Sequence, residues 1–333
     1  MSKVIEYLSE KNIPYLVDVE LKYQTYFKMG GVCKLLILPV TVEQLELIIQ
    51  HLNIINQPYK VIGGTCNTIF INESVYNIIV STKNCRSVTI TPDKYAEVSC
   101  GYDLQEFTRI ALINKATGFE GLEGIPGTIG GAIFMNAGAY GYSISDRLIS
   151  VKYIDGNNSI VIQSKAELEF QFRSSKFKKN PNLTIVSALF DLTELSSTDE
   201  ISHKMEKYHI ARHSYQEFAY PNLGSMFSTK GDMYAEIFHR SRYQSFLCLI
   251  LKLIYKNPVS KFIYRKNPSN KIMNDLVLAF HKLQYPISHK SINILINNGA
   301  VTSEDILQHI DKMKDLYCAS TELENEIVIP KVD

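Results

Sequence analysis

The stretch GLEGIPGTIGGAIFMNAGAYG, residues 121–141, decides the fold class, because it is the most glycine-dense segment of the chain. Missing side chains let backbone N–H groups approach a ligand closely, and successive N–H groups form a concave site for phosphate oxygens. Pro126 and the β-branched Thr128 and Ile129 keep such a loop stiff. Neither a Walker G-K-[ST] sequence nor the Rossmann glycine spacing is present. Two interpretations stay open, a phosphate-binding loop or a set of tight structural turns.

A second segment of small residues, GGTCNT at 63–68, directly follows the predicted strand YKVI at 59–62. Two glycines and four small polar side chains at the end of a strand suit a pyrophosphate. They suit a plain turn equally well. This segment alone therefore does not indicate a ligand.

Length and charge narrow the class of protein. The 333 residues suggest two or three domains. Lys and Arg total 35 against 34 Asp and Glu, so the net charge is +1, which argues against a nucleic-acid partner. Apolar residues make up 45% of the chain, which excludes wholesale disorder. The oligomeric state expected is a monomer or a weak oligomer.

Cysteine usage and hydropathy indicate a cytoplasmic protein. The six cysteines lie far apart with no C-x-x-C pair, which is typical of reduced thiols. Glu6 and Glu10 interrupt the apolar run that a signal peptide needs. The most lipophilic stretch, 246–255, contains Lys252 and is too short to cross a bilayer, which needs roughly 20 apolar residues. We therefore expect no membrane insertion.

Hydrophobic periodicity predicts a strand–helix–strand unit early in the chain. LLILP at 35–39 is a predicted strand, and Thr41 opens the capping-box sequence T-V-E-Q before an amphipathic helix. YKVI at 59–62 and IIV at 78–80 are two further predicted strands. A strand–helix–strand unit is the simplest interpretation of this pattern, with Gly63 and Gly64 at the end of its second strand.

The rest of the chain reads as antiparallel-rich α+β structure. Residues 86–215 alternate short strand-like runs with one helix at 104–114. A strand and turn at 291–299, a helix capped by Thr302 and a last strand at 327–329 follow. Residues 231–285 are rich in Lys, Tyr, Phe and Ile, and their two KNP tripeptides predict turns.

Taken together, the motifs resemble a known family. VIGGTCN at 61–67, the 121–141 segment and FQFRSSKF at 170–177 occur in the order found in UDP-N-acetylenolpyruvoylglucosamine reductases, the flavoenzymes that complete UDP-N-acetylmuramate in peptidoglycan synthesis. YFKMGG is similar to the family's opening segment. LGSMF at 223–227, SHKSINILIN at 288–297 and LENEI at 323–327 are similar to its C-terminal signatures. The resemblance runs from residue 20 to 330, apart from 231–285.

The resemblance implies an α+β fold, namely an FAD-binding fold of the vanillyl-alcohol-oxidase type in two subdomains, with a third α+β domain for the substrate. The subdomains expected are 1–84 and 85–212, followed by the substrate domain at 213–320 and a C-terminal segment at 321–333. By analogy the two small-residue segments hold non-covalent FAD. The residues implied are Gly63, Gly64, Thr65, Cys66, Asn67, Thr68, Gly124, Ile125, Pro126, Gly127, Thr128, Gly130, Gly131, Ala132, Asn136, Gly138 and Ala139.

The resemblance also implies a reaction. NADPH reduces the flavin, and hydride then passes to the enolpyruvyl group of UDP-N-acetylglucosamine enolpyruvate, a nucleotide-sugar substrate. Arg173 matches the arginine that stabilises the developing enolate-like charge. Ser225 matches the proton donor, and Glu326 matches the acid that acts with Arg173 on the substrate carboxylate. Without the resemblance, Arg173 reads as a surface arginine and Ser225 as a turn residue. Glu324 reads as an exposed strand neighbour of Glu326.

Several departures keep alternatives open. Thr65 and Cys66 replace a Gly and a Ser of the family, Phe172 replaces a Tyr, and 228–230 reads STK instead of KNP. These changes also fit a paralogue that acts on another nucleotide-sugar in surface-polysaccharide synthesis, or a duplicate that binds FAD without turnover. His203, His209 and His213 read as solvated helix residues, and no metal is expected.

Overall fold

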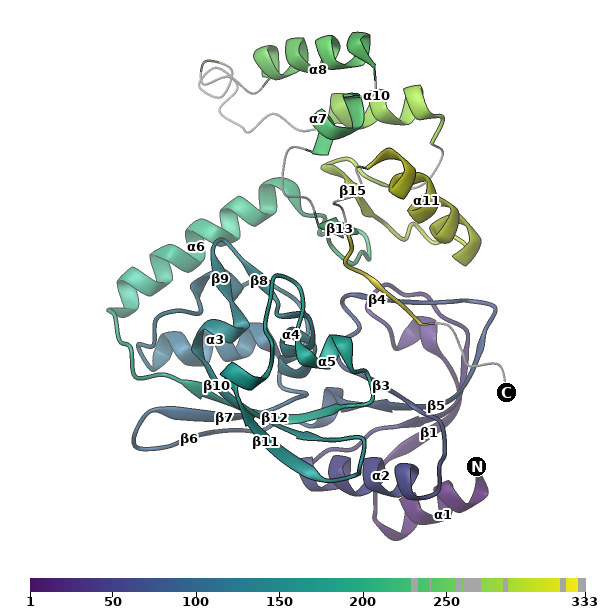
Figure 1. Ribbon diagram of the computed structural model, residues 1–333, viewed down its shortest axis with the longest axis vertical. Coiled ribbons are helices and arrows are strands. Elements are labelled where there is room, and N and C mark those ends of the chain that lie inside the picture. The colour runs from purple at the N-terminus through teal and green to yellow at the C-terminus, as the bar shows by residue number, and fades with distance from the viewer. Residues whose placement is uncertain are drawn as a thin grey trace.

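The computed structural model describes residues 1–228, 233–239, 241–255, 259, 271–283, 287–317 and 322–328. Figure 1 shows two sheets with helices packed around them in the lower part of the molecule and a smaller, mostly helical part at the top. The predicted turns at 256–258 and 266–268, and Cys318, lie outside the described residues. The five described cysteines carry free thiols.

A four-stranded sheet forms the N-terminal part. Its strands are β1 (Tyr15–Glu20), β2 (Val32–Ile37), β5 (Val75–Ser81) and β3 (Lys60–Ile62), in that spatial order, and helices α1 (Ser2–Glu10) and α2 (Val42–Ile54) accompany them. The predicted strands and helix are confirmed, and the Thr41 hydroxyl accepts a hydrogen bond from the Gln44 N–H at 3.2 Å. However, β5 lies between β2 and β3 and is parallel to both. Its buried Ile-Ile-Val run suits this central position.

A five-stranded sheet follows, and all its strand pairs are antiparallel, which confirms the antiparallel-rich prediction. Helices α3 (Leu104–Ile113), α4 (Ile129–Met135), α5 (Lys176–Lys179) and α6 (Thr198–Tyr215) belong to this part of the chain. The spatial order of the strands is β11 (Ile160–Ser164), β10 (Leu148–Ile154), β12 (Thr184–Asp191), β7 (Tyr95–Ser99) and β6 (Val88–Ile90). The hairpin β8 (Gly138–Ala139) and β9 (Tyr142–Ser143) follows α4.

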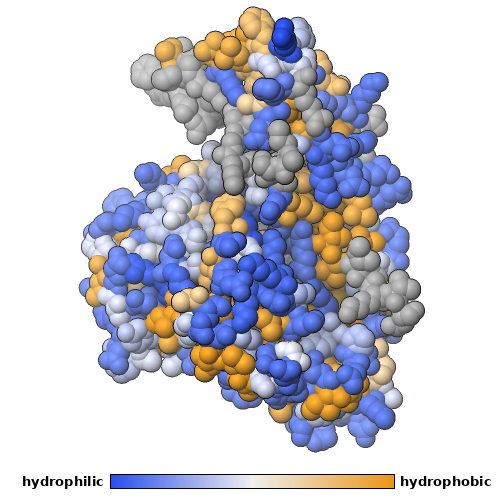
Figure 2. Space-filling model, viewed as in Figure 1, coloured by the Kyte–Doolittle hydropathy of each residue, from blue (hydrophilic) through white to orange (hydrophobic). Residues whose placement is uncertain are grey.

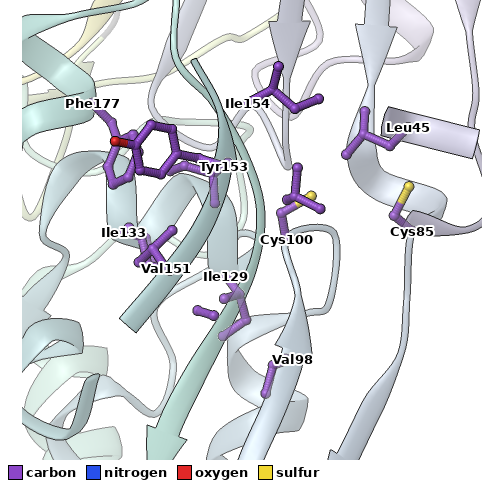
Figure 3. Close-up of a cluster of buried hydrophobic side chains, with 14 of the residues drawn as sticks. Leu45, Cys85, Val98, Cys100, Ile129, Ile133, Val151, Tyr153, Ile154 and Phe177 are labelled. Atoms are coloured by element: carbon purple, nitrogen blue, oxygen red, sulfur yellow. The ribbon is translucent and has the colours of Figure 1, made fainter. Parts of the chain in front are cut away.

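One hydrophobic core joins the two sheets. It includes Leu45 of α2, Cys100 at the end of β7, and Ile129 and Ile133 of α4. Figure 3 shows these side chains together with Tyr153 and Phe177. Because α4 contributes two buried isoleucines, the core fixes the helix that follows the Pro126–Thr128 turn, and so fixes the turn itself.

A second core lies in the C-terminal part and is built from α7 (Met233–Phe238), α8, α10, α11 and their strands, and the N-terminal residues Phe27, Met29 and Ile69 also belong to it. The elements are α8 (Arg242–Tyr255), α10 (Lys271–His281), α11 (Ser303–Leu316), β13 (Phe227–Ser228), β14 (Ile287–Ser288), β15 (Ser291–Leu295) and β16 (Glu322–Leu323). The predicted cap of Thr302 is confirmed, with its hydroxyl accepting from the Asp305 N–H at 3.1 Å. No helix among the described residues combines the length and the apolar character that crossing a membrane requires.

The last strand returns to the N-terminal part. Residues Glu326–Val328 form β17, which pairs in parallel with β4 (Thr68–Phe70), directly after the GGTCNT segment. The predicted strand at 327–329 is therefore confirmed for its first two residues, while residue 329 is outside the described chain. This pairing places Glu326 beside Thr68.

Candidate active site

A cavity of about 1140 Å³ lies where the two small-residue segments meet. Gly64 and Gly127 stand in direct contact, since a Cβ built on Gly64 would lie 2.9 Å from the Gly127 Cα. A Cβ on Gly63 would lie 2.4 Å from the Thr128 hydroxyl oxygen. Glycine at 63 and 64 therefore lets the two segments pack closely, Gly64 against the Gly127 backbone and Gly63 against the Thr128 side chain.

The first segment turns sharply after β3. Thr65 adopts a left-handed backbone, with φ 56°, and its hydroxyl accepts a hydrogen bond from the Tyr26 N–H at 2.8 Å. That bond ties the segment to the YFKMGG motif and offsets part of the strain of a β-branched residue in this conformation. Burial raises the pKa of the Cys66 thiol to about 12, so this thiol stays protonated.

Part of the second segment is helical, which the sequence did not predict. Residues Ile129–Met135 form α4, and the Thr128 hydroxyl caps it by accepting from the Gly131 N–H at 3.4 Å. A Cβ on Gly130 would lie 2.9 Å from the Cys100 Cβ, so glycine there allows α4 to pack closely on β7. Two glycines and two β-branched residues disfavour a helix locally, but packing of Ile129 and Ile133 overrides that propensity.

Asn136 differs from the other residues that the resemblance implied for the cofactor. It ends α4 in a left-handed conformation, with φ 44°, and it does not line the cavity. Its side-chain amide donates to the Gln171 carbonyl at 2.8 Å. Asn136 thus joins the end of α4 to the turn that carries Arg173. All the other residues predicted to hold FAD line the cavity.

The backbone around the cavity suits a dianionic diphosphate. The N–H groups of Cys66, Asn67 and Gly127 make no hydrogen bond within the described part of the chain. Such N–H groups can donate to phosphate oxygens without a surplus of Lys or Arg, in line with the near-zero net charge. The chemistry of the donor set and the space left by the glycines therefore fit FAD.

Arg173 lines the cavity at the tip of a tight turn in which Gln171 and Ser174 are hydrogen-bonded to each other. Its backbone is left-handed, with φ 53°, and its Nε donates to the Glu324 carboxylate at 3.3 Å. Glu324 was predicted to be an exposed strand residue, and this prediction is wrong. Only 16% of its side chain is exposed, and it lies in the break between β16 and β17.

Glu326 also lines the cavity, but its carboxylate contacts a different cation, Lys60 of β3. Its N–H donates to the Asn67 carbonyl at 2.9 Å, in the small-residue segment. The two acidic residues of LENEI therefore pair with different partners, Glu324 with Arg173 and Glu326 with Lys60. Sequence reasoning missed Lys60, because a lysine in a short strand carries no motif.

Ser225 lines the same cavity and belongs to the LGSMF segment, residues 223–227. Gly224 before it has φ 70°, and the Met226 N–H after it donates to the Asn293 carbonyl at 2.8 Å. The Asn293 side chain also bonds both the N–H and the carbonyl of Phe227. Asn293 of β15 therefore holds the LGSMF turn, and the Ser225 hydroxyl makes no hydrogen bond within the described residues.

Helix α6 contributes two cavity residues that the sequence did not single out as a site. The Arg212 guanidinium is buried against Gly124 and donates to the Glu123 carbonyl at 3.1 Å. The prediction that His209 is a solvated helix residue is confirmed, since half of its side chain is exposed. It also lines the cavity, and its ring lies 3.2 Å from the Glu123 carboxylate. No signal marked these residues, because the few apolar residues of α6 do not form a clear amphipathic pattern. Among the described residues, no group of three His, Cys, Asp or Glu is placed to hold a metal.

Comparisons with known proteins agree with this geometry. Residues 33–163 match a family described as an FAD binding domain, a range that contains both small-residue segments. A crystal structure of UDP-N-acetylenolpyruvylglucosamine reductase from Thermus caldophilus superposes with a TM-score of 0.66, covering 95% of this chain and 99% of its own, at 21% identity. The α+β FAD-binding fold predicted from the sequence is thereby confirmed.

Curated relatives carry the same name. UDP-N-acetylenolpyruvoylglucosamine reductase of Lactococcus lactis subsp. cremoris is 34% identical over 220 residues, which are 65% of this chain and 73% of the relative. The protein of that name from Fervidobacterium nodosum is 28% identical and covers 99% of this chain and 96% of its own length. Bacillus cereus UDP-N-acetylenolpyruvoylglucosamine reductase 2 is 34% identical over 71% of this chain and 77% of its own. The chain belongs to the UDP-N-acetylenolpyruvoylglucosamine reductase family.

Proposed function

We propose that this chain is a cytoplasmic FAD enzyme that uses NADPH to reduce UDP-N-acetylglucosamine enolpyruvate to UDP-N-acetylmuramate in peptidoglycan synthesis. The observation that carries the proposal is the convergence of Arg173, Ser225 and Glu326 on one cavity with both small-residue segments. These three residues come from distant parts of the chain, so a shared cavity is not a consequence of sequence proximity. The family membership points to the same reaction.

The cofactor would be held by the two segments that meet at Gly64 and Gly127. The free N–H groups of Cys66, Asn67 and Gly127 are the donors available to its diphosphate. Bound there, FAD would supply the hydride chemistry between the nicotinamide and the enolpyruvyl double bond. Arg212 and the α4 cap keep the backbone of the second segment in place.

The protein's own contribution is charge and one proton. Hydride addition at the terminal vinyl carbon leaves negative charge on the neighbouring carbon and on the carboxylate conjugated with it. Arg173 provides a fixed cation for that carboxylate, and Glu324 keeps the guanidinium oriented. The Ser225 hydroxyl donates the proton that completes the reduction. Glu326 is assigned to act with Arg173 on the substrate carboxylate.

An anaerobic half-reaction experiment tests the proposal. The purified protein is reduced with NADPH until the flavin absorbance bleaches, and UDP-N-acetylglucosamine enolpyruvate is then added. The proposal expects rapid return of the oxidised spectrum and one equivalent of UDP-N-acetylmuramate. A flavin that bleaches but is not reoxidised would exclude this acceptor, leaving another nucleotide-sugar or a non-catalytic duplicate. Purified protein that neither carries nor takes up flavin would overturn the cofactor assignment as well.

A further inference from the structure

Helix α8 lies at the end of the molecule, at the top of Figure 1 and far from the two sheets. One of its sides carries large apolar residues that are open to solvent. Tyr243, Phe246, Leu249 and Leu253 are exposed to 68%, 63%, 55% and 63% respectively. Their spacing of three, three and four residues places them on a single face of the helix. Figure 2 shows hydrophobic side chains gathered over this end of the molecule.

The opposite side of α8 is fixed to the protein. Cys248 is buried in the C-terminal core and Leu251 packs against that core. Near the start of the helix, the Ser245 hydroxyl donates to the Phe238 carbonyl of α7 at 3.0 Å. Because this inner side anchors the helix, the apolar outer side faces away from the domain. Exposed apolar patches of this kind mark contact surfaces.

The charge of the surrounding sequence is strongly asymmetric. Residues 237–274 contain eight of the chain's 35 Lys and Arg residues and none of its 34 Asp and Glu residues. The rest of the chain therefore carries 27 basic and 34 acidic residues. On the helices themselves, Arg242 at the start of α8 and Lys271 at the start of α10 belong to this basic stretch. An apolar helical face inside a purely basic segment calls for a partner that is both apolar and anionic.

We propose that the outer face of α8 docks this protein onto an anionic phospholipid bilayer. Lipid acyl chains cover the apolar face, and anionic headgroups pair with basic residues of this segment such as Arg242 and Lys271. A second copy of the chain would bring two strongly basic segments together, which the charge disfavours. A nucleic acid or another acidic polymer would pair with the charges but would leave Phe246 and Leu249 exposed. Of these three partners, the anionic bilayer surface satisfies both features.

The length of α8 determines its orientation relative to the bilayer. Its 14 residues extend about 21 Å, which is shorter than the roughly 30 Å hydrocarbon core of a bilayer. The helix therefore lies in the interface plane, and no part of the chain needs to cross the membrane. Docking through this end leaves the cavity with Arg173 and Ser225 outside the contact, since none of its lining residues belongs to α8.

Vesicle sedimentation with the full-length protein tests the proposal. Sedimentable vesicles are prepared from phosphatidylcholine alone or from phosphatidylcholine with about one-third phosphatidylglycerol. We expect the protein to sediment with the anionic vesicles and not with the zwitterionic ones. The partition coefficient should fall roughly tenfold or more when NaCl is raised from about 0.05 M to about 0.5 M.

Two variants separate the apolar and the charged contributions. Phe246→Ser/Leu249→Ser should lower the partition coefficient about tenfold or more, since it removes the side chains that enter the lipid. Arg242→Gln/Lys271→Gln should lower it less and should weaken the salt dependence. The matched control is Ile113→Ser/Ile210→Ser, which removes two apolar residues of α3 and α6 that are at least as exposed as Phe246 and Leu249 and should bind like the wild type. Circular dichroism verifies that each variant is folded.

The proposal is overturned if the wild type fails to sediment with anionic vesicles, or if it binds both lipid compositions equally. It is also overturned if the serine variant at 246 and 249 binds like the wild type. If the protein bound immobilised heparin but not vesicles, and the serine variant at 246 and 249 bound heparin equally well, the partner would be an acidic polymer. If the wild type self-associated in analytical ultracentrifugation but did not bind vesicles, and the serine variant did not self-associate, the partner would be a second copy of the chain.

Discussion

The carboxylate of Glu326 is ion-paired with the ammonium group of Lys60, on the strand that leads into the first small-residue segment. The pair joins β17 to β3 and places a cation beside the acid assigned to the substrate carboxylate. Both side chains are about one-third exposed, so solvent screens the pair. Its contribution is therefore in positioning Glu326 and has little weight in the stability of the fold.

Replacing Lys60 should impair catalysis mildly and selectively. Lys60→Met leaves Glu326 without its partner, and we expect kcat/KM for the enolpyruvyl substrate to fall about two- to fivefold, the range of a screened ion pair. Lys60→Arg should restore most of the loss. Steady-state kinetics with measured flavin content provide the check. A variant with unchanged kinetics would show that Lys60 does not position Glu326.

Ser225→Ala should separate the two halves of the reaction. The proton donor is needed only after hydride has left for the substrate, so reduction of the flavin by NADPH should persist. Reduction of the sugar nucleotide should slow about 10²- to 10⁴-fold, the usual contribution of a positioned acid. Rapid-mixing spectroscopy of each half-reaction measures this.

The control for this change is Ser228→Ala, three residues along the same segment. The Ser228 hydroxyl donates to the Glu322 carbonyl at 3.3 Å and takes no part in the proposed chemistry. It should keep wild-type rates. Equal slowing in both variants would point to a disturbed segment in place of a lost proton donor.

Removing the charge of Glu324 should affect Arg173. Glu324→Gln keeps the shape of the side chain but weakens the bond to the Arg173 Nε, so the cation is held less firmly for the substrate carboxylate. We expect KM to rise several-fold with a smaller change in kcat. Glu322→Gln, at an exposed position on β16, is the matched control and should leave KM unchanged. A KM unchanged by Glu324→Gln would contradict the positioning role.

Gly64→Ala should loosen the cofactor cavity. The added Cβ would lie 2.9 Å from the Gly127 Cα, so the two segments must separate. Overpacking of this kind costs about 1–3 kcal/mol. We expect a lower melting temperature and flavin loss during purification, measured by thermal unfolding and by the absorbance ratio of flavin to protein. Gly156→Ala, whose Cβ meets no atom within 4 Å, should retain the flavin.

His309 makes the stability depend on pH. Burial, together with the nearby Lys312, lowers the pKa of His309 to about 4 from 6.5. Between these values the unfolded chain binds a proton that the folded chain does not, so stability falls as the pH drops from 6.5 towards 4. The loss attributable to this residue reaches about 3 kcal/mol.

Denaturant unfolding as a function of pH tests the His309 prediction. His309→Leu should flatten the free energy of unfolding between pH 6.5 and 4 relative to the wild type, whatever its effect at neutral pH. Carboxylates that titrate in the same range are common to both proteins and cancel in the difference. Parallel curves for the two proteins would rule out His309 as the titrating group.

Local signals predicted much of this fold. The caps of Thr41 and Thr302, the helix at 104–114 and the antiparallel strands of the second sheet were all readable, because each depends on neighbouring residues. The central position of β5 was not readable, since strand order is set by packing across the sheet. Helix α4 was missed because its glycines and β-branched residues oppose a helix that only the core stabilises.

The candidate site divides in the same way. Motif resemblance identified Arg173, Ser225 and Glu326, and the structure brings them to one cavity. The sequence could not reveal the partners that hold them. Lys60, Glu324 and Asn293 act through contacts between distant segments. A polar side chain that supports another residue leaves no periodic pattern, and its role is visible only once the chain is folded.

The pairing of β17 with β4 also orders events on the ribosome. Thr68 is synthesised 258 residues before Glu326, its partner in the register. Both sheets, and the contact between the two small-residue segments at Gly64 and Gly127, can therefore form before Glu326 has been translated. The pairing of β17 with β4 is thus a late, non-local step of folding. A nascent chain that ends before residue 326 would have the segments proposed to hold the cofactor but not Glu326, so this acid joins the cavity only after residue 326 has been translated.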